Sequence, residues 1–248
     1  MKQFCLTTSM SKRLIGKALA AHPDIRAVLR QGTLAIIAGT TNGYVAEETL
    51  TALGQADGFT RAGFRRGFTA APGAKAINAE FSGDVILVDG QWQRGKTVDQ
   101  VADDLKMGDI ILKGANAFDR HGQAAVQIGH PKGGTILAAL PAVIGRRVRL
   151  IVPVGLEKRV PENIDTLVRL CNAPGGEGPR LMSLIGGEIF TEIDALRLLV
   201  GVDAHLFAAG GIYGAEGSSW LGVWGTTEQE KAAVALIKSI ADEPPCSV

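Results

Sequence analysis

The most restrictive feature of this sequence is a regular alternation between short apolar runs and helical patterns. Residues 33–38 read TLAIIA, a continuous apolar run typical of a strand that is buried on both faces. A turn of small polar residues follows, and then a helical stretch over residues 44–53. The same order recurs, with strands predicted at 85–88, 109–112 and 148–152 and helices at 98–106, 135–144 and 162–172. This alternation predicts an α/β fold with a mainly parallel, Rossmann-like sheet and helices on both faces.

A segment rich in Gly and Pro divides the sequence. Residues 173–179 read APGGEGP, which indicates a boundary or a long turn. We therefore expect a Rossmann-like domain over residues 1–173. A small α+β subdomain of the ferredoxin-like type, with one strand missing or borrowed, is expected over residues 180–242. Residues 243–248 are expected to form a frayed tail.

The charge balance restricts the classes of partner. The chain has 26 Lys and Arg against 25 Asp and Glu, so it lacks the positive field on which non-specific binding of nucleic acid or anionic membranes depends. No stretch approaches the ~20 apolar residues that cross a bilayer, and the first residues lack the apolar core of a signal peptide. Its 3 Cys and 4 His show no metal-binding spacing. We expect a cytoplasmic protein with no metal, no cofactor, and no nucleic-acid or membrane partner.

The turn after the first apolar run is a candidate anion site. It contains Gly39, Thr40, Thr41 and Asn42, and it opens a predicted helix. In parallel α/β sheets, ligands bind beyond the carboxyl ends of the strands. Backbone N–H groups, hydroxyls and the positive end of a helix dipole together suit phosphate or carboxylate. The alternative is a tight turn in which Thr41 or Asn42 is a plain helix cap.

Three further turns could contribute to the same site. Each follows a predicted strand or opens a predicted helix, and each has an alternative as a solvated loop, a plain helix start or a local ion pair with Glu157. The candidate ligand-binding residues in these turns are Lys113, Gly114 and Asn116; Gly133, Gly134 and Thr135; and Lys158. The spacing around Gly133 is not that of a Walker A motif, so an ATP site of that type is not expected.

Catalysis at such a site would need a carboxylate close to a transferable proton. The candidate catalytic acids are Asp119, Glu188 and Glu216. Asp119 could instead be a turn residue, and Glu216 could belong to an irregular hairpin around residues 210–217. The basic cluster of Arg61, Arg65 and Arg66 is interpreted as a solvated face, with an anion clamp as the alternative.

Several of these stretches together resemble the superfamily of ribose-5-phosphate isomerase, glucosamine-6-phosphate deaminase and the CoA transferases. The run IIAGTT at 36–41 is similar to its opening strand and turn. The branch of methylthioribose-1-phosphate isomerase and the initiation factor 2B subunits shows a pattern similar to the one found here. That pattern comprises Asp109, Gly114-Ala115-Asn116, Gly122, Gly129, Gly134-Thr135, Val152-Pro153 and Lys158.

The resemblance implies a ligand that is a phosphorylated sugar, a nucleotide or a CoA-type metabolite, and isomerase-like or transferase-like chemistry. The isomerases of that branch carry an acid where this chain has Asn116, and an amide cannot act as a carboxylate base. Two hypotheses follow: an enzyme that acts on such a metabolite, or a non-catalytic protein that senses it in the same pocket. A homo-oligomer is compatible with either.

Overall fold

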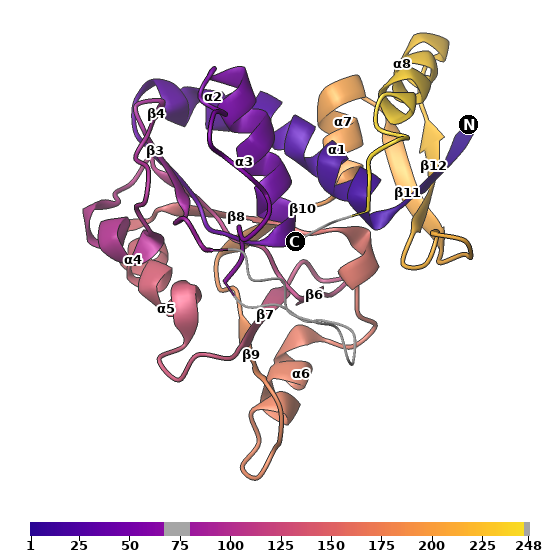
Figure 1. Cartoon of the computed structure of the whole chain (residues 1–248). Helices are drawn as coiled ribbons and strands as arrows, with labels where there is room; N and C mark the ends of the chain where they lie inside the picture. Colours follow the sequence, from indigo (N-terminus) through magenta and orange to yellow (C-terminus); the bar gives the residue numbers. More distant parts are fainter. Residues whose placement is uncertain (67–79, 246–248) are drawn as a thin grey trace.

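The structure, a computed structural model, describes residues 1–66 and 80–245. It is a mixed α/β fold with three sheets, and eight α-helices lie in the described part of the chain. Figure 1 shows a central sheet covered by helices, a second sheet beside it that carries α7 and α8, and a third, smaller sheet near α6.

The central sheet is mixed and has the strand order β10-β8-β5-β2-β3-β4. Its first four strands run parallel to one another, and β3 and β4 continue it in antiparallel pairing. Four of its strands, all predicted from the sequence, are almost wholly buried. The bounds are β2 (Thr33–Ile36), β3 (Val85–Val88), β4 (Gln91–Trp92), β5 (Ile110–Leu112), β8 (Arg149–Pro153) and β10 (Gly187–Phe190).

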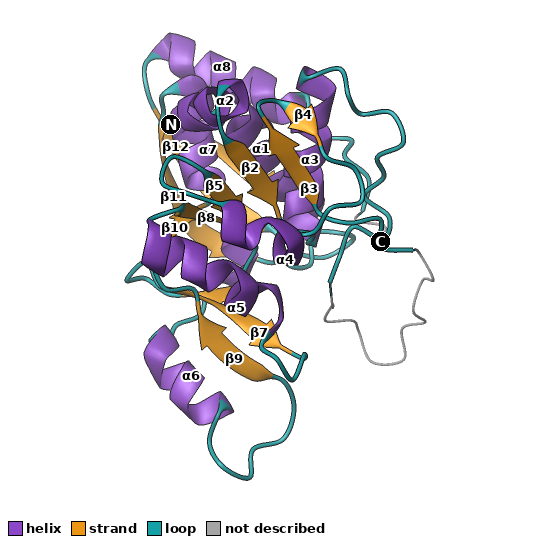
Figure 2. Cartoon of the chain, turned by 90° about the vertical axis from the view of Figure 1, so that its left-hand side faces the viewer, coloured by secondary structure: helices purple, strands orange, loops and turns teal. Residues whose placement is uncertain are grey.

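Helices flank this sheet on both sides, with α1 and α3 on one side and α4 and α5 on the other (Figure 2). Gly16 lets α1 approach α3, because a Cβ at that position would lie 2.9 Å from the carbonyl oxygen of Tyr44. The helices here are α1 (Thr8–Ala21), α2 (Pro23–Arg30), α3 (Thr40–Ala52), α4 (Val98–Val101) and α5 (Gly134–Leu140). A 3₁₀ turn at Ala102–Asp104 follows α4, and a π-helical turn at Pro141–Gly145 follows α5 where proline ends the regular helix.

The second sheet joins the two ends of the chain. Its order is β1-β12-β11, so the amino-terminal strand β1 (Lys2–Leu6) pairs antiparallel with β12 (Ser219–Trp224), which also pairs with β11 (Asp203–Ala209). Two helices accompany this sheet, α7 (Glu192–Val200) and α8 (Thr227–Lys238). Strand β1 therefore brings residues that the sequence assigned to the first domain into a sheet with β11 and β12.

The third sheet lies around the predicted boundary at 173–179. It has the order β6-β7-β9, from strands β6 (Ala117–Phe118), β7 (Ala124–Ile128) and β9 (Arg180–Ser183), with helix α6 (Ile164–Cys171) beside it. Strand β9 pairs with β7, and the next strand, β10, pairs with β8. Residues after 179 therefore extend two sheets whose other strands come from residues before 173.

The chain end beyond α8 is held against the molecule at Glu243. This carboxylate accepts hydrogen bonds from Arg13 at 2.8 and 3.0 Å, and its side chain is only 11% exposed. The expectation of a frayed tail over 243–248 is therefore wrong at residue 243, because an ion pair with α1 holds it. Residues 246–248 lie outside the described residues.

Candidate functional site

The candidate site lies at the carboxyl edge of the central sheet, defined here as the edge where the parallel strands β2, β5, β8 and β10 end. The segments that follow these strands are 37–42, 113–116, 154–158 and 191–192. Because β3 runs in the opposite direction, Asp84, just before it, lies at the same edge. Parallel topology thus brings together five stretches that are far apart in the sequence.

The first turn is joined directly to the end of β5. The Asn42 amide donates to the carbonyl oxygens of Ile37 (2.7 Å) and Leu112 (3.0 Å), so it ties the ends of two neighbouring strands together. Asn42 is fully buried and its role here is structural. Gly39 precedes α3 in an extended conformation, and Thr40 is exposed at the first position of the helix.

Thr41 differs from its neighbours in having a buried hydroxyl without a partner. The residue is 3% exposed, and its Oγ1 has no hydrogen-bond partner within the described parts of the chain. A buried hydroxyl without a partner is costly, so such groups in native proteins call for an explanation. At the first turn of a 13-residue helix, next to the free backbone N–H groups, it is placed to donate to an anion.

Lys113 follows β5 and is half-buried. Its ammonium donates to the carbonyl of Gly114 at 3.3 Å, and no carboxylate of residues 1–66 and 80–245 lies within 4.0 Å of it. Burial and the positive charges of Lys158 and Arg66 lower the pKa of Lys113 to about 8, against a smaller opposing effect of Asp84. A cation held in this way gains from a negatively charged ligand.

Lys158 comes from the segment after β8, and its ammonium reaches the loop that carries Lys113. It ends a 3₁₀ turn at Leu156–Lys158, is half-buried, and donates to the carbonyl oxygen of Ala115 at 2.8 Å. Burial lowers its pKa, and Lys12 adds to this effect while Glu157 opposes it. The predicted local pair of Lys158 with Glu157 does not form within 4 Å in the described structure; Glu157 pairs with Lys12 instead, at 3.3 Å.

Two acids complete this edge: Glu157, which is among the possible acids in the sequence, and Glu192, which the sequence analysis did not select. Glu192, in the first turn of α7, is fully buried and accepts from the backbone N–H of Leu156 at 3.0 and 3.2 Å. Burial and the nearby charge of Glu157 raise the pKa of Glu192 to about 7. Glu157 has one buried oxygen, Oε2, with no partner in the described residues. The position of Glu192 just after a strand could have marked it as a site residue. It was missed because strand β10 itself was not predicted.

An ion pair closes the edge on the side of β3. The buried carboxylate of Asp84 accepts from the backbone N–H groups of Ala38 (2.9 Å) and Val98 (2.7 Å) and from Arg66 (2.8 Å). Burial raises the pKa of Asp84 despite these donors. Arg66 also pairs with Asp99 at 2.7 Å, so it is not part of a solvated face.

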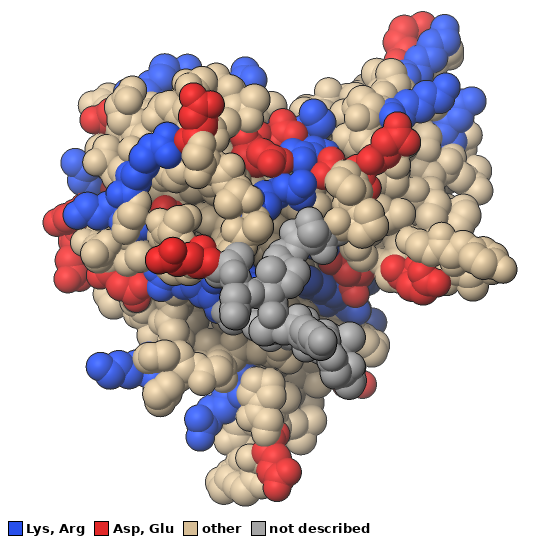
Figure 3. Space-filling view, in the orientation of Figure 1, with Lys and Arg blue, Asp and Glu red and all other residues tan. Residues whose placement is uncertain are grey.

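Arg61, the first member of the predicted basic cluster, points in another direction. It pairs with Glu47 at 3.3 Å and with Glu243 at 3.5 Å, and its guanidinium lies 4.0 Å from the ring centre of Tyr44. The interpretation of Arg61 and Arg66 as a solvated face is wrong, because both are bound to carboxylates. Figure 3 shows basic and acidic side chains interspersed over the face that it presents.

Two predicted site residues belong to the third sheet. Asn116 is exposed, and its side-chain oxygen accepts from the backbone N–H of Gln127 at 2.9 Å. Asp119 is buried and accepts from three backbone N–H groups, those of His121, Gln123 and Ile164. Burial alone would raise the pKa of Asp119, but these donors outweigh it and hold the pKa below its ordinary value. Asp119 thus links a hairpin to the start of α6, in agreement with its alternative as a turn residue.

The other two predicted acids lie away from the carboxyl edge. Glu188 is on the exposed part of β10 and forms a two-point pair with Arg149, at 2.8 and 2.7 Å. Glu216 is exposed in the turn between β11 and β12, where it accepts from the backbone N–H of Gly214 at 2.9 Å. Neither carboxylate is brought to Lys113 or Lys158.

The glycines at the start of α5 are separate from the group formed by Lys113, Lys158 and the start of α3. Gly133 has φ of 77°, and a Cβ there would lie 2.2 Å from a Leu137 side-chain atom, so only glycine fits. Gly134 and Thr135 are half-buried. In the described part of the chain, no hydrogen bond joins these three residues to Lys113 or to α3, and α5 has only seven residues.

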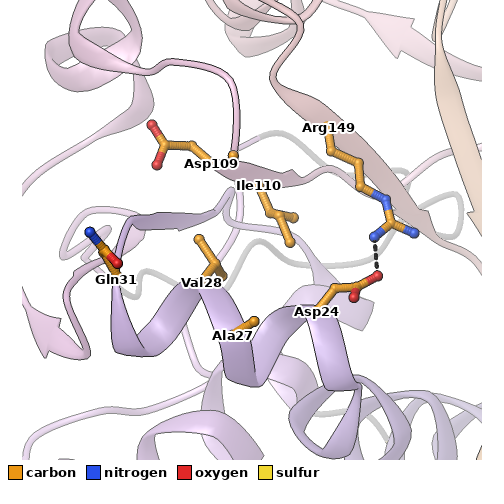
Figure 4. Close-up of a pocket in the computed structure, with 8 residues that line it drawn as sticks. Asp24, Ala27, Val28, Gln31, Asp109, Ile110 and Arg149 are labelled. Atoms are coloured by element: carbon orange, nitrogen blue, oxygen red, sulfur yellow. Dashed lines mark hydrogen bonds and ion pairs between the residues drawn. The ribbon is translucent and has the colours of Figure 1, made fainter.

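A shallow cavity of about 460 Å³ lies at the opposite, amino edge of the sheet, where β5 and β8 begin (Figure 4). Its charged side chains already have partners. Arg149 binds Asp24 and Glu188, and Asp109 accepts from the backbone N–H groups of Thr33 and Lys106. The cavity therefore offers a ligand no charge that is not already paired.

Neither a membrane span nor a metal cluster is found in the described residues. Within 1–66 and 80–245, no helix combines the length and apolar character needed to cross a bilayer. In the same residues, no three His, Cys, Asp or Glu side chains gather as a set of metal ligands. Comparison of the chain with family models, curated proteins and solved structures found no match.

Proposed function

We propose that this chain binds a small anionic metabolite, carrying a phosphate or a carboxylate, at the carboxyl edge of its central sheet. The observation that carries the proposal is the pair Lys113 and Lys158. Both residues are half-buried, they follow the neighbouring strands β5 and β8, and their ammonium groups donate to the successive carbonyls of Gly114 and Ala115 in the described structure. Two neighbouring cations without a bound carboxylate repel each other, and an anion between them would relieve that repulsion.

The first turn of α3 supports the same ligand. Asn42 fixes this turn against the end of β5, directly before Lys113. The backbone N–H groups at the start of α3 and the Thr41 hydroxyl would bind an anion from one side. The two lysines would bind it from the other side. The predicted residues Gly39, Thr40 and Gly114 would shape this turn rather than contact the ligand through side chains.

The paired acids favour an enzyme over a passive binding protein. Burial, together with the nearby charge of Glu157, raises the pKa of Glu192 to about 7, which is suited to proton transfer near neutral pH. We infer an enzyme that acts on a phosphorylated sugar, a nucleotide or a CoA-type metabolite, in isomerase-like or transferase-like chemistry. A non-catalytic sensor with the same pocket is the second candidate, favoured by the exposed position of Asn116 where the resembling isomerases carry an acid.

The resemblance to the ribose-5-phosphate isomerase and CoA transferase superfamily belongs to this proposal. With it come a Rossmann-like layout for the central sheet, a ferredoxin-like arrangement for the carboxyl-terminal subdomain, a cytoplasmic location and a homo-oligomeric state. A metabolite as partner, rather than a nucleic acid or a membrane, follows from the near-neutral charge of the chain.

Thermal unfolding with and without inorganic phosphate or phosphorylated sugars tests the binding. A ligand at one hundred times its Kd should raise the Tm by about 5 to 10 °C. Lys113→Met should abolish most of this shift, and Thr41→Val should reduce it without lowering the Tm of the free protein. The control Lys231→Met removes an exposed lysine on α8 and should keep the full shift. A full shift in Lys113→Met would overturn the proposal, and product formed in the same screen would separate the enzyme from the sensor.

A further inference from the structure

The structure contains a lysine whose surroundings suit it to more than electrostatic binding. An anion site needs only a fixed positive charge, which arginine provides without losing its proton. Lys113 is instead a primary amine that is half-buried, with its nitrogen 3.3 Å from the carbonyl oxygen of Gly114, and the nitrogen of Lys158 lies 2.8 Å from the next carbonyl oxygen, that of Ala115. Desolvation and an adjacent cation are the two conditions that turn a lysine into a nucleophile.

We propose that Lys113 forms an imine with the carbonyl carbon of a small aldehyde or ketone that also carries a phosphate or a carboxylate. This inference rests on the proposed function, because the anionic group of the substrate would be held by Lys158 and the start of α3. It goes beyond that function in assigning a covalent role to Lys113 and a carbonyl group to the substrate.

The neutral amine is available in useful amounts. With a pKa of about 8, roughly a tenth of Lys113 is uncharged at pH 7, whereas a lysine with an ordinary pKa is almost entirely charged. The hydrogen bond of its nitrogen to the Gly114 carbonyl is long, at 3.3 Å, so little is lost when the amine turns toward a substrate.

The reaction balances without an oxidant or a reductant. The nitrogen lone pair of Lys113 attacks the carbonyl carbon, and the carbon–oxygen π electrons move to the oxygen, which takes up a proton. The nitrogen loses a proton, the carbon–oxygen bond then breaks, and one water molecule leaves as the carbon–nitrogen double bond forms. The ammonium of Lys158, which binds the carbonyl of Ala115 two residues after Lys113, would supply the proton that the departing oxygen needs.

Reductive trapping tests the inference on the full chain. The protein is incubated with glyoxylate and sodium cyanoborohydride, which reduces an imine to a stable amine, and modified lysines are identified by peptide mass spectrometry. We expect Lys113 to be modified at least tenfold faster than Lys231, an exposed lysine on α8. Acetaldehyde, which lacks an anionic group, should show no such preference, and inorganic phosphate should slow the reaction at Lys113.

Variants separate this inference from the binding proposal. Lys158→Met should slow modification of Lys113, because it removes both the anion anchor and the neighbouring charge. Lys113→Arg should keep phosphate binding and lose the modified peptide. Equal rates at Lys113 and Lys231 would overturn the imine, and if phosphate still raises the Tm, the anion site stands without it. Fast modification by acetaldehyde as well as glyoxylate would overturn the anionic part of the substrate assignment.

Discussion

The two edges of the central sheet treat charge in opposite ways. At the amino edge a cavity of about 460 Å³ is present, and Arg149 is held by Asp24 and Glu188. At the carboxyl edge, Lys113 and Lys158 have only carbonyl partners among the residues that the structure describes, and Glu192 is buried beside Glu157. The comparison teaches that a hollow lined by paired charges is a poor indication of function. Charges that the fold leaves uncompensated are a better one.

The same comparison applies to burial. Asp24 and Glu188, at the amino edge, are more than half exposed as side chains, so water screens their pairs with Arg149. Asp84 and Glu192, at the carboxyl edge, are 1% and 0% exposed. A charge in the second environment has a large effect on stability or reactivity, which gives three ways to test the difference.

The largest effect is expected from Asp84→Ala. The substitution leaves the N–H groups of Ala38 and Val98 without a buried acceptor and removes one partner of Arg66. Because breaking a buried pair leaves uncompensated polar groups, the free energy of unfolding should fall by about 3 kcal/mol. Urea unfolding followed by circular dichroism measures it. A loss no larger than that of Asp24→Ala would show that the two edges do not differ.

An intermediate effect, dependent on pH, is expected from Glu192→Gln. The folded-state pKa of about 7 lies above the ordinary value of 4.5, so the folded protein binds more protons than the unfolded chain between these values. Wild-type stability from this group is present at low pH and is lost as pH rises through 7. The variant lacks that loss, so its stability relative to wild type should be about 2 kcal/mol more favourable at pH 8 than at pH 5.

The matched control for this prediction is Glu188→Gln at the amino edge. It removes an exposed carboxylate of the same chemistry, and its effect should change far less between pH 5 and pH 8. Chemical unfolding at both pH values provides the measurement. If both variants respond to pH in the same way, burial at the carboxyl edge does not control Glu192.

The smallest effect is expected from Asp24→Ala. The Asp24 side chain is 56% exposed, and Arg149 keeps its two bonds to Glu188 when Asp24 is removed. The free energy of unfolding should fall by less than about 1 kcal/mol, and 1 M NaCl should abolish most of that difference. A loss of several kcal/mol would instead make the amino edge as sensitive as the carboxyl edge.

The predicted elements agree best with the structure where one face or both faces of an element are apolar. The strands at 85–88 and 109–112 and the helix at 162–172 have bounds close to those observed. Short strands with mixed composition were not predicted, among them β6, β7 and β10, because a strand of two to five residues has too few positions to show a period. Prediction of the site residues had the same limit. Lys113 and Lys158 were selected because they come after predicted strands, whereas Glu192 comes after a strand that was not predicted.

Local sequence by itself determined the alternation of helices and buried strands and the polar turns at strand ends, because both depend on neighbours within a few residues. Tertiary structure alone decided which of those turns meet. It paired β1 with β12 across more than two hundred residues, turned Asp119 into a helix anchor, and left Lys113 next to Lys158 with an acid pair close by. Burial and the distance between charges arise only when separate strands align, so no residue pattern along the chain could reveal them.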